Sequence, residues 1–206
     1  MSKRGYHHGN LRSALVDAVL SLISEKGPSG FSVAEAARRA GVSPAAPYRH
    51  FKDRDDMLIE TAKRGYEVFA ARLEAAWDGG RPSPLSSFER VGRAYLGFAK
   101  AEPAYFASMF EAGVSPEDDP DLRAAADRAF RALEQACEAV ANTLPPERRP
   151  PVLMMAHHIW ALTHGVTALF GRADEARRPA PISAEDLLEA GAGIYLRGLG
   201  ILPEDG

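Results

Sequence analysis

The chain has 206 residues, enough for one or two domains with a sizeable core, and its 46% apolar and 26% charged residues are typical of globular proteins. Its net charge of −3 is unevenly distributed: residues 1–52 hold eight Lys and Arg against three Asp and Glu, so the remainder is acidic. No apolar run of about 18 residues could span a bilayer, and the polar N-terminal residues lack the apolar segment of a secretory signal. We therefore expect a cytoplasmic protein with no membrane partner.

A single cysteine, Cys137, excludes an internal disulfide framework and a cysteine-based zinc site, and we expect it to be a core thiol. Residues 1–9 include Lys3 and Arg4 and show no periodicity, so we expect a flexible basic arm that could reach phosphates or the minor groove. The pair at 7–8 is His-His, but adjacent histidines in a flexible arm lack the fixed geometry of a metal site. We expect no metal and no cofactor.

A first helix is expected after Asn10, which is a plausible N-cap, because apolar residues recur there at helical spacing as far as Ile23. Gly27 and Pro28 end it. Its apolar face must cover the two short helices that follow, because two short helices cannot bury a core alone. We therefore expect three helices in the N-terminal part of the chain.

Two short helices around a tight turn come next. Ser32, followed three residues later by Glu35, forms a capping box that starts a helix at Val33. Gly41 supplies the backbone freedom that a sharp turn after this helix needs. The turn therefore ends this helix and allows a second one to start after it.

A second helix start follows at Ser43, a good N-cap, with Pro44 at the first helical position. This helix carries the aromatic and basic run at 48–52, and Pro47 should tighten or distort its first turn. Helix, glycine turn and helix with exposed donors is the pattern that places a recognition helix in the DNA major groove. The alternative is a surface helical hairpin whose charges are simply solvated.

A long helix is expected from a cap at Asp53 to Trp77, where Gly79 and Gly80 stop it. At 1.5 Å per residue its roughly 25 residues span about 37 Å, so it would link the N-terminal part to the rest of the chain. Further helices are expected over about 85–102, from Pro103, from Pro120 to about Leu144, over 152–170, and from Ser183.

The helix expected at 152–170 is apolar nearly all round, so it should be buried on several sides. The small residues at 190–193 would let the last two helices pack closely, and both helices suit a subunit interface. The histidines at 157, 158 and 164 show no HExxH arrangement and no third ligand, so a buried or interfacial histidine bonded to a carbonyl is favoured over a metal site or a catalytic base.

These segments resemble the TetR family of bacterial transcriptional regulators. The most specific part is FSVAEAARRAGVSPAAPYRHFKDRDDMLIETA, and HHIWALTHGVTALF is similar to the family's C-terminal domain type named for Trp-His-Gly. The resemblance implies an all-α homodimer with an N-terminal helix-turn-helix DNA-binding domain at 1–52 and a helical-bundle ligand-binding and dimerisation domain at 53–206. Its partners would be a double-stranded DNA operator and a small-molecule effector.

The resemblance also implies site residues. Phosphate contacts would come from Tyr48, His50, Lys52 and Arg54, and groove contacts from Ser43, Ala45, Ala46 and Arg49. The N-terminal candidates for DNA binding are Lys3, Arg4 and Asn10. The candidate pocket lining is mainly aromatic, with plain core packing as the alternative for each member: Phe88, Tyr95, Phe98, Phe106, Met109, Phe110, Phe130, Trp160 and His164.

The function expected from these features is a ligand-responsive repressor that releases a palindromic operator when it binds a small molecule. One alternative is an architectural DNA-binding protein without an effector, whose affinity would depend on salt but not on sequence. A helical enzyme is disfavoured, because the sequence has no Gly-rich phosphate loop, no GxSxG turn and no nucleophilic cysteine with partners.

Overall fold

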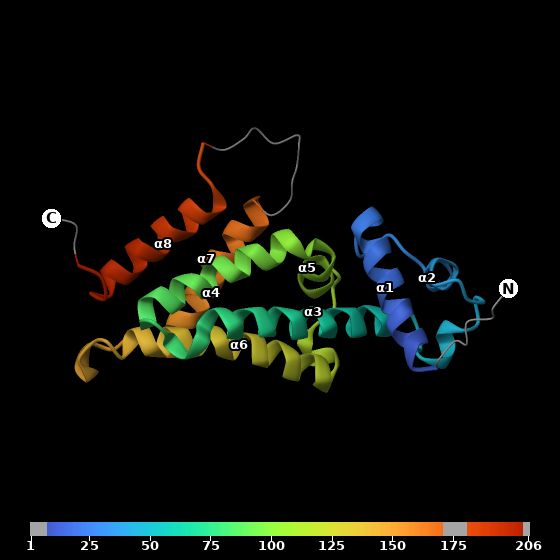
Figure 1. Ribbon diagram of the computed structural model, residues 1–206, viewed down its shortest axis with the longest axis horizontal. Helices are drawn as coiled ribbons and strands as arrows, with labels where there is room; N and C mark the ends of the chain where they lie inside the picture. Colours follow the sequence, from blue (N-terminus) through green and yellow to red (C-terminus); the bar gives the residue numbers. More distant parts are fainter. Residues whose placement is uncertain (1–7, 171–180, 204–206) are drawn as a thin grey trace. The chain divides into compact units, whose positions relative to one another are not determined.

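The computed structural model describes residues 8–170 and 181–203, with the backbone alone for 8–10, and all regular elements in these ranges are helical (Figure 1). In chain order they are α1 (His8–Lys26), α2 (Val33–Arg39), η1 (Pro47–Arg49), α3 (Arg54–Trp77), η2 (Asp78–Gly80), α4 (Pro84–Ala101), α5 (Pro103–Phe110), η3 (Pro116–Asp118), α6 (Pro120–Ala141), η4 (Pro146–Arg148), α7 (Val152–Phe170) and α8 (Ala184–Gly198). The predicted all-α fold is confirmed. In the described ranges no helix is both long and apolar enough to cross a membrane.

Most helix ends lie at the predicted start and stop signals. At the start of α2, Ser32 accepts a hydrogen bond from the Glu35 N–H, and the Glu35 side chain accepts one from the Ser32 N–H. Ser183 and Asp186 make the same reciprocal pair at the start of α8. The helix α7 covers the predicted range 152–170. Local hydrogen-bonding rules therefore determine these ends.

The helix α1 begins earlier than predicted. It starts at His8, so Asn10 lies inside the helix instead of capping it. An Asn in a helix interior costs less than about 1 kcal/mol relative to Ala, so a single Asn does not set a helix end.

The chain divides into two compact units. The first consists of Met1–Val68 and Glu102–Ala126, and the second of Phe69–Ala101 and Asp127–Gly206. The helices α3 and α6 therefore each contribute residues to both units. The functional boundary predicted after Lys52 stays a prediction.

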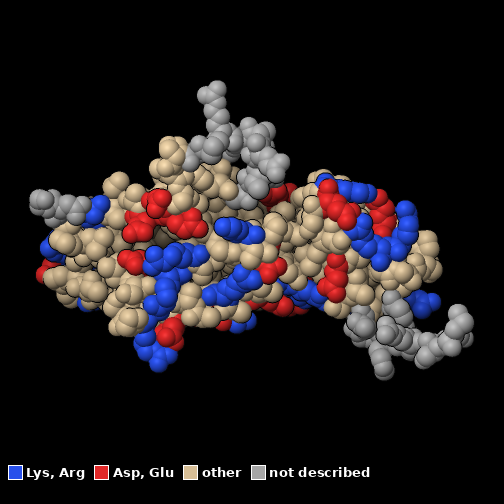
Figure 2. Space-filling model, turned by 45° about the horizontal axis from the view of Figure 1, so that its top comes forward, with Lys and Arg blue, Asp and Glu red and all other residues tan. Residues whose placement is uncertain are grey.

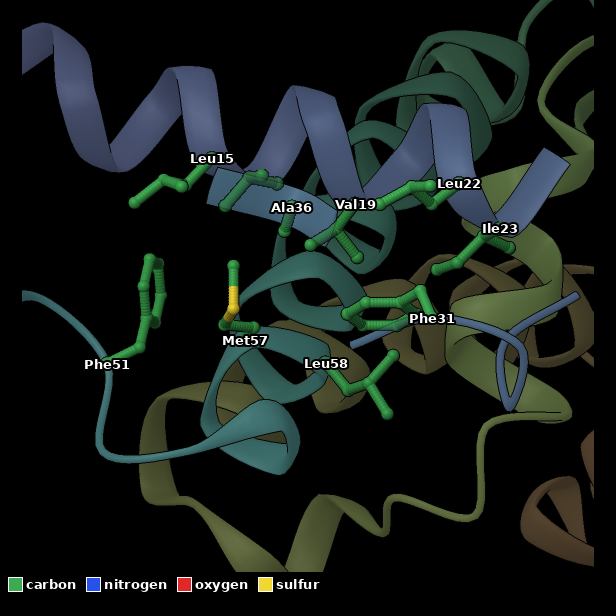
Figure 3. Packing of buried hydrophobic residues seen from close by; sticks show 10 residues of the cluster. Leu15, Val19, Leu22, Ile23, Phe31, Ala36, Phe51, Met57 and Leu58 are labelled. Carbon is green, nitrogen blue, oxygen red and sulfur yellow. The ribbon is translucent and has the colours of Figure 1, made fainter. Parts of the chain in front are cut away.

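The core of the first unit is built largely by α1 (Figure 3). Side chains from α1, α2 and the start of α3 point toward one another there. The buried cluster consists of Leu15, Val16, Val19, Leu22, Ile23, Phe31, Ala36, Phe51, Met57 and Leu58. Because each fully buried large apolar side chain stabilises by about 1.5 to 3 kcal/mol, α1 supplies the cover that the two short helical segments cannot provide for themselves.

The second unit joins α4, α7 and α8 through Leu96, Val166 and Leu188, which are all buried. In α8, a Cβ atom at Gly191 would lie 3.1 Å from the Leu162 side chain of α7, so the small residue permits this close packing. Cys137 is fully buried, and burial raises the pKa of its thiol to about 12. The predicted core thiol is confirmed.

The helix α7 is less buried than predicted. Met155 and Ile159 face the core of the second unit, but Leu153 and Met154 are each 56% exposed and Leu169 is 59% exposed. In the described residues α7 packs mainly against α4 and α8, and the Phe130 ring of α6 meets its His157 and Trp160, so these neighbours cover only part of its circumference. The prediction of a helix buried on several sides is therefore wrong for the single chain.

Candidate nucleic-acid interface

The helix α2 and the turn after it have the predicted geometry. The small residues Ala36 and Ala37 are fully buried, so α2 packs closely onto α1. Gly41 has a φ of +71°, a conformation that a residue with a side chain rarely adopts. The Val42 N–H then donates to the Ala37 carbonyl at 3.0 Å and closes the turn. This turn sets where the chain re-emerges for the next segment.

The predicted second helix of the pair is not an α-helix. Its place is taken by a turn at 44–45 and by the short 3-10 helix η1, and η1 ends at Arg49, before Lys52. Pro47 has no N–H to donate to the Ser43 carbonyl, and that carbonyl instead accepts from the Ala46 N–H at 3.0 Å. The expected distortion at Pro47 therefore extends through the whole helix.

We call residues 43–52 the recognition segment. Its apolar anchors Pro47 and Phe51 are buried, with Phe51 only 2% exposed. The candidate DNA contacts lie on the other side. Tyr48 is 60% exposed, and Ser43, Ala45, Arg49 and Lys52 are exposed as well, whereas Ala46 and His50 are half-buried. The structure thus brings the candidates between Ser43 and Lys52 into one outward-facing segment.

Arg54 differs from the other candidates, because its guanidinium already has partners within the first unit. It donates to the carbonyls of Phe31, at 3.2 Å, and Pro28, and it lies 4.8 Å from the Phe31 ring centroid. These contacts fasten the loop between α1 and α2 to the start of α3. A phosphate contact by Arg54 would have to compete with them, and it stays a prediction. Lys3, Arg4 and the Asn10 side chain lie outside the described residues.

Ion pairs neutralise several basic residues of α1 and α2. Lys26 Nζ lies 2.7 Å from Glu35 Oε1, and Arg39 pairs with Glu25 at 2.5 Å. On the face drawn in Figure 2, acidic and basic side chains lie next to one another. In contrast, Arg49 and Lys52 make no ion pair with any described residue. Their positive charges are therefore available to a partner of opposite charge.

The candidate pocket residues fall into both units. Phe106, Met109 and Phe110 lie on α5 in the first unit, where the Phe110 ring packs edge-on against Tyr66 at 5.8 Å. Gly65 adjoins this group, because a Cβ atom there would lie 2.8 Å from the sulfur of Met109.

The other six candidates lie in the second unit: Phe88, Tyr95 and Phe98 on α4, Phe130 on α6, and Trp160 and His164 on α7. Tyr95 Oη is 2.8 Å from His164 Nδ1, and the Phe130 and Trp160 rings are 5.8 Å apart. Phe69 was not among the predicted residues, although its ring lies 4.9 Å from Tyr95 and 4.8 Å from Phe98. Its place in the apolar repeat of the long helix was a signal that could have included it.

An open hollow of about 640 Å³ in the second unit lies beside η2 and is lined by Ala75, Asp78, Arg81, Pro82 and Arg90. It shares no residue with the candidate pocket lining. Its two guanidinium groups are occupied locally: Arg81 pairs with Asp78 at 2.5 Å, and Arg90 donates to the Ala76 carbonyl at 3.0 Å. The hollow therefore offers no free charged group to a ligand.

The histidines of α7 have local partners. His157 Nδ1 lies 2.7 Å from the Leu153 carbonyl oxygen, and His158 Nδ1 lies 3.1 Å from Tyr195 Oη. Among the described residues, no group of three or more His, Cys, Asp or Glu side chains is placed to hold a metal ion. His157 thus contacts a carbonyl as expected but is exposed, whereas His158 and His164 meet tyrosine hydroxyls.

Two family descriptions match the chain. Residues 15–61 match "Bacterial regulatory proteins, tetR family", and residues 88–192 match "Tetracyclin repressor-like, C-terminal domain". The first range contains α2 and the whole recognition segment. The second covers half of the chain and includes Trp160, His164 and Gly165.

Curated relatives resemble the N-terminal part. The HTH-type transcriptional regulator BetI of Rhizobium meliloti (strain 1021) is 42% identical over 52 residues, which are 25% of this chain and 26% of that protein. The HTH-type transcriptional regulator AcrR of Shigella flexneri is 43% identical over 49 residues, 24% of this chain and 23% of that protein. The match thus spans about a quarter of the length of these relatives.

Solved structures share the whole fold. A protein of unknown function from Rhodococcus sp. RHA1 is 26% identical with a TM-score of 0.77, and the match covers 95% of this chain and 98% of that one. The TetR family transcriptional regulator PfmR from Thermus thermophilus has a TM-score of 0.68 at 22% identity, with 89% and 97% covered. These similarities agree with the two family matches and with the geometry of α2 and the turn after it. Together they show that the chain is a transcriptional regulator with a helix-turn-helix DNA-binding domain and that it belongs to the TetR family.

Proposed function

We propose that this protein is a ligand-responsive repressor that binds a roughly palindromic operator as a homodimer and releases it when a small molecule binds. The observation that carries the proposal is the two-sided recognition segment, in which buried Pro47 and Phe51 anchor exposed Tyr48, Arg49 and Lys52. Exposed donors on a rigidly anchored segment can be presented to DNA without a large ordering cost.

The contacts divide by chemistry. Tyr48, His50 and Lys52 would bond phosphates and fix the orientation on the duplex, whereas Arg49 would read a base edge, most simply O6 and N7 of a guanine. The small side chains at Ala45 and Ala46 would let the backbone approach the groove. Arg49 and Lys52 support this division, because both are exposed and neither is engaged in an ion pair with a described residue.

Dimerisation would use the exposed apolar face of α7 and α8. These two helices carry five large apolar side chains with exposed fractions between 37% and 68%: Leu153, Met154, Trp160, Leu169 and Ile194. Covering them with a second copy would remove their apolar surface from water. A two-fold pair would hold two recognition segments about 34 to 36 Å apart, which is one turn of DNA.

The effector site would lie among the aromatic residues of the second unit. Tyr95, Phe98 and Phe69 form a contiguous aromatic group, and the Tyr95 hydroxyl and His164 supply polar groups beside it. A small molecule changes operator affinity only by binding one conformation of the protein better than the other. Operator release therefore requires that the effector bind the DNA-free conformation more tightly.

The proposal is tested by electrophoretic mobility shift on DNA flanking the protein's own coding region, repeated with pooled metabolites. We expect a shifted band that resists excess unrelated DNA and that one metabolite fraction abolishes. A band that any DNA displaces equally would support an architectural DNA-binding protein instead. A specific band that no fraction alters would contradict the ligand response alone.

A further inference from the structure

The recognition segment is too short to hold its own position. Its regular part, η1, has only three residues. At the end of η1, the N–H groups of His50 and Phe51 both donate to the Pro47 carbonyl, at 2.9 and 3.0 Å. A longer recognition helix would have several turns of such bonds. The orientation of Tyr48 to Lys52 must therefore depend on contacts from outside the segment.

Arg12 of α1 supplies such contacts at the C-terminal end of the segment. Its Nη1 donates to the His50 carbonyl at 3.2 Å, and its guanidinium carbon lies 4.8 Å from the centroid of the buried Phe51 ring. Its Nη2 donates to Glu60 Oε2 at 2.7 Å. One side chain thus connects α1, the end of the recognition segment and α3, all within the first unit.

Glu60 is built to hold Arg12 in place. Its side chain is only 12% exposed, and its Oε2 also lies 3.1 Å from Lys63 Nζ. Burial by itself would raise the pKa of Glu60, but the hydrogen bonds and the positive charges of Arg12 and Lys63 together outweigh burial and lower it. Lys63 Nζ also lies 3.9 Å from Oδ2 of exposed Asp121. A surface ion pair of this kind contributes little to stability, so the series of contacts that starts at Arg12 effectively ends at Glu60.

We propose that Arg12 is a positioning residue for DNA recognition, which clamps the His50 carbonyl and the Phe51 ring against α3 through Glu60. This inference rests on the proposed function, because it takes the recognition segment as the DNA-contacting part. Arg12 acts on DNA through the segment and need not touch the duplex itself.

A direct phosphate contact by Arg12 is the competing explanation, since its side chain is 44% exposed. The two roles differ in salt dependence. Loss of one phosphate contact reduces the slope of log K against log salt concentration by about 0.9, whereas loss of a positioning residue lowers affinity and leaves that slope nearly unchanged. The two roles also predict opposite effects on DNA binding when the charge of Glu60 is removed. Removing a negative charge near DNA should strengthen binding if only charge matters, but should weaken binding if Glu60 holds the clamp.

The test compares Arg12→Gln, Glu60→Gln and the double variant with Glu25→Gln. Glu25 is the matched control, because it also pairs with an arginine in the first unit, at 2.5 Å from Arg39 Nη1, and touches no part of the recognition segment. Affinities are measured by fluorescence anisotropy over a range of salt concentrations. The probes are a duplex that the wild-type chain enriches from a random pool and a shuffled duplex of the same composition.

We expect Arg12→Gln and Glu60→Gln each to lower the affinity for the enriched duplex about tenfold, with little change in affinity for the shuffled duplex. A tenfold loss is the effect of one hydrogen bond made by a charged group. The double variant should be no weaker than either single variant. Glu25→Gln should bind at least as tightly as the wild type. A reduced salt slope for Arg12→Gln, or tighter binding by Glu60→Gln, would overturn the proposal.

Hydrogen exchange on the DNA-free chain supplies a readout that does not depend on operator binding. Arg12→Gln should speed exchange in peptides covering 43–53 and leave those covering 33–39 unchanged. If the wild-type chain enriched no duplex, the proposed function would fail, and unchanged exchange at 43–53 would separately reject the positioning role. Thermal unfolding monitored by circular dichroism confirms that each variant is folded.

Discussion

The hydroxyl of Tyr95 lies 2.8 Å from Nδ1 of His164, and this contact joins α4 to α7 inside the second unit. Tyr95 is 5% exposed and its ring packs on Phe69 at 4.9 Å, so the hydroxyl has little access to water. A buried polar group is retained at low cost only while its partner is present. The pair therefore ties the candidate effector region to a helix that we assign to the dimer interface.

Tyr95→Phe removes the hydroxyl and keeps the ring. We expect unfolding in urea to require about 1 kcal/mol less free energy, because one hydrogen bond is lost and the His164 nitrogen is left without this partner. The control is Tyr195→Phe, whose hydroxyl meets the exposed His158 at 3.1 Å and should matter less. Equal losses of unfolding free energy in the two variants would show that the buried hydrogen bond stabilises the fold no more than the exposed one.

The Arg49→Ala and Lys52→Ala variants should lose different parts of DNA binding. Lys52→Ala should weaken binding to all duplexes and reduce the salt slope by about 0.9. Arg49→Ala should cost about 1 to 3 kcal/mol on the operator and relax the sequence preference at one base pair. Binding to a set of operators with single base changes measures both effects. If both variants weaken all duplexes equally, Arg49 does not read a base.

Gly165→Leu tests the dimer face of α7. A Cβ atom at Gly165 meets nothing within 4 Å in the single chain, so a larger side chain should be tolerated in the folded subunit. A second α7 packed closely against this face would have no room for it. We expect the variant to be monomeric by light scattering and to bind the operator poorly.

Gly97→Leu is the matched control for Gly165→Leu. Gly97 is an exposed glycine inside α4, also with nothing within 4 Å of an added Cβ. Both substitutions gain helix propensity by an amount on the order of 1 kcal/mol, so a difference in association cannot come from helix stability. A dimer that persists in Gly165→Leu would place the interface elsewhere.

The acid sensitivity of the first unit should depend on Glu35. The hydrogen bond from Lys26, followed by that from the Ser32 N–H, lowers the pKa of Glu35 from its ordinary 4.5 to about 2. A lowered pKa in the folded state means that ionised Glu35 stabilises above about pH 4.5 and that this contribution is lost as the pH falls toward 2.

Glu35→Gln should therefore lower the thermal midpoint at pH 7, and the difference from the wild type should shrink as the pH falls from 4.5 toward 2. Glu67→Gln is the control, because Glu67 is an exposed carboxylate of the first unit that pairs with no described basic residue. Circular dichroism melts across this pH range make the comparison. A constant difference at all pH values would assign the effect to the capping box geometry alone.

Local signals predicted the fold well. The capping box at Ser32, the helix start at Ser183 and the ends of α7 depend on residues within one helical turn, and all were predicted. The recognition segment was only partly predicted. Pro47 was expected to distort one turn, but a segment of ten residues has too few remaining backbone bonds to stay α-helical once the bond to Ser43 is lost.

Features that depend on tertiary packing could not be read from periodicity. The aromatic residues of α4 and α5 are adjacent in sequence, yet Phe98 and Phe106 lie in different units. Apolar residues around all sides of α7 indicated burial, but a second subunit can supply the cover as well as the same chain can. Arg12 was not a candidate, because its role depends on partners 38 and 48 residues away.

Sequence-specific recognition by residues 43–52 is tested most directly by titrating the full chain onto two duplexes at one salt concentration. One carries DNA flanking its coding region and the other carries the same bases in shuffled order. We expect two chains to bind the first duplex at least about 10³-fold more tightly than the shuffled one. Equal affinity for both duplexes would contradict sequence-specific recognition by this segment.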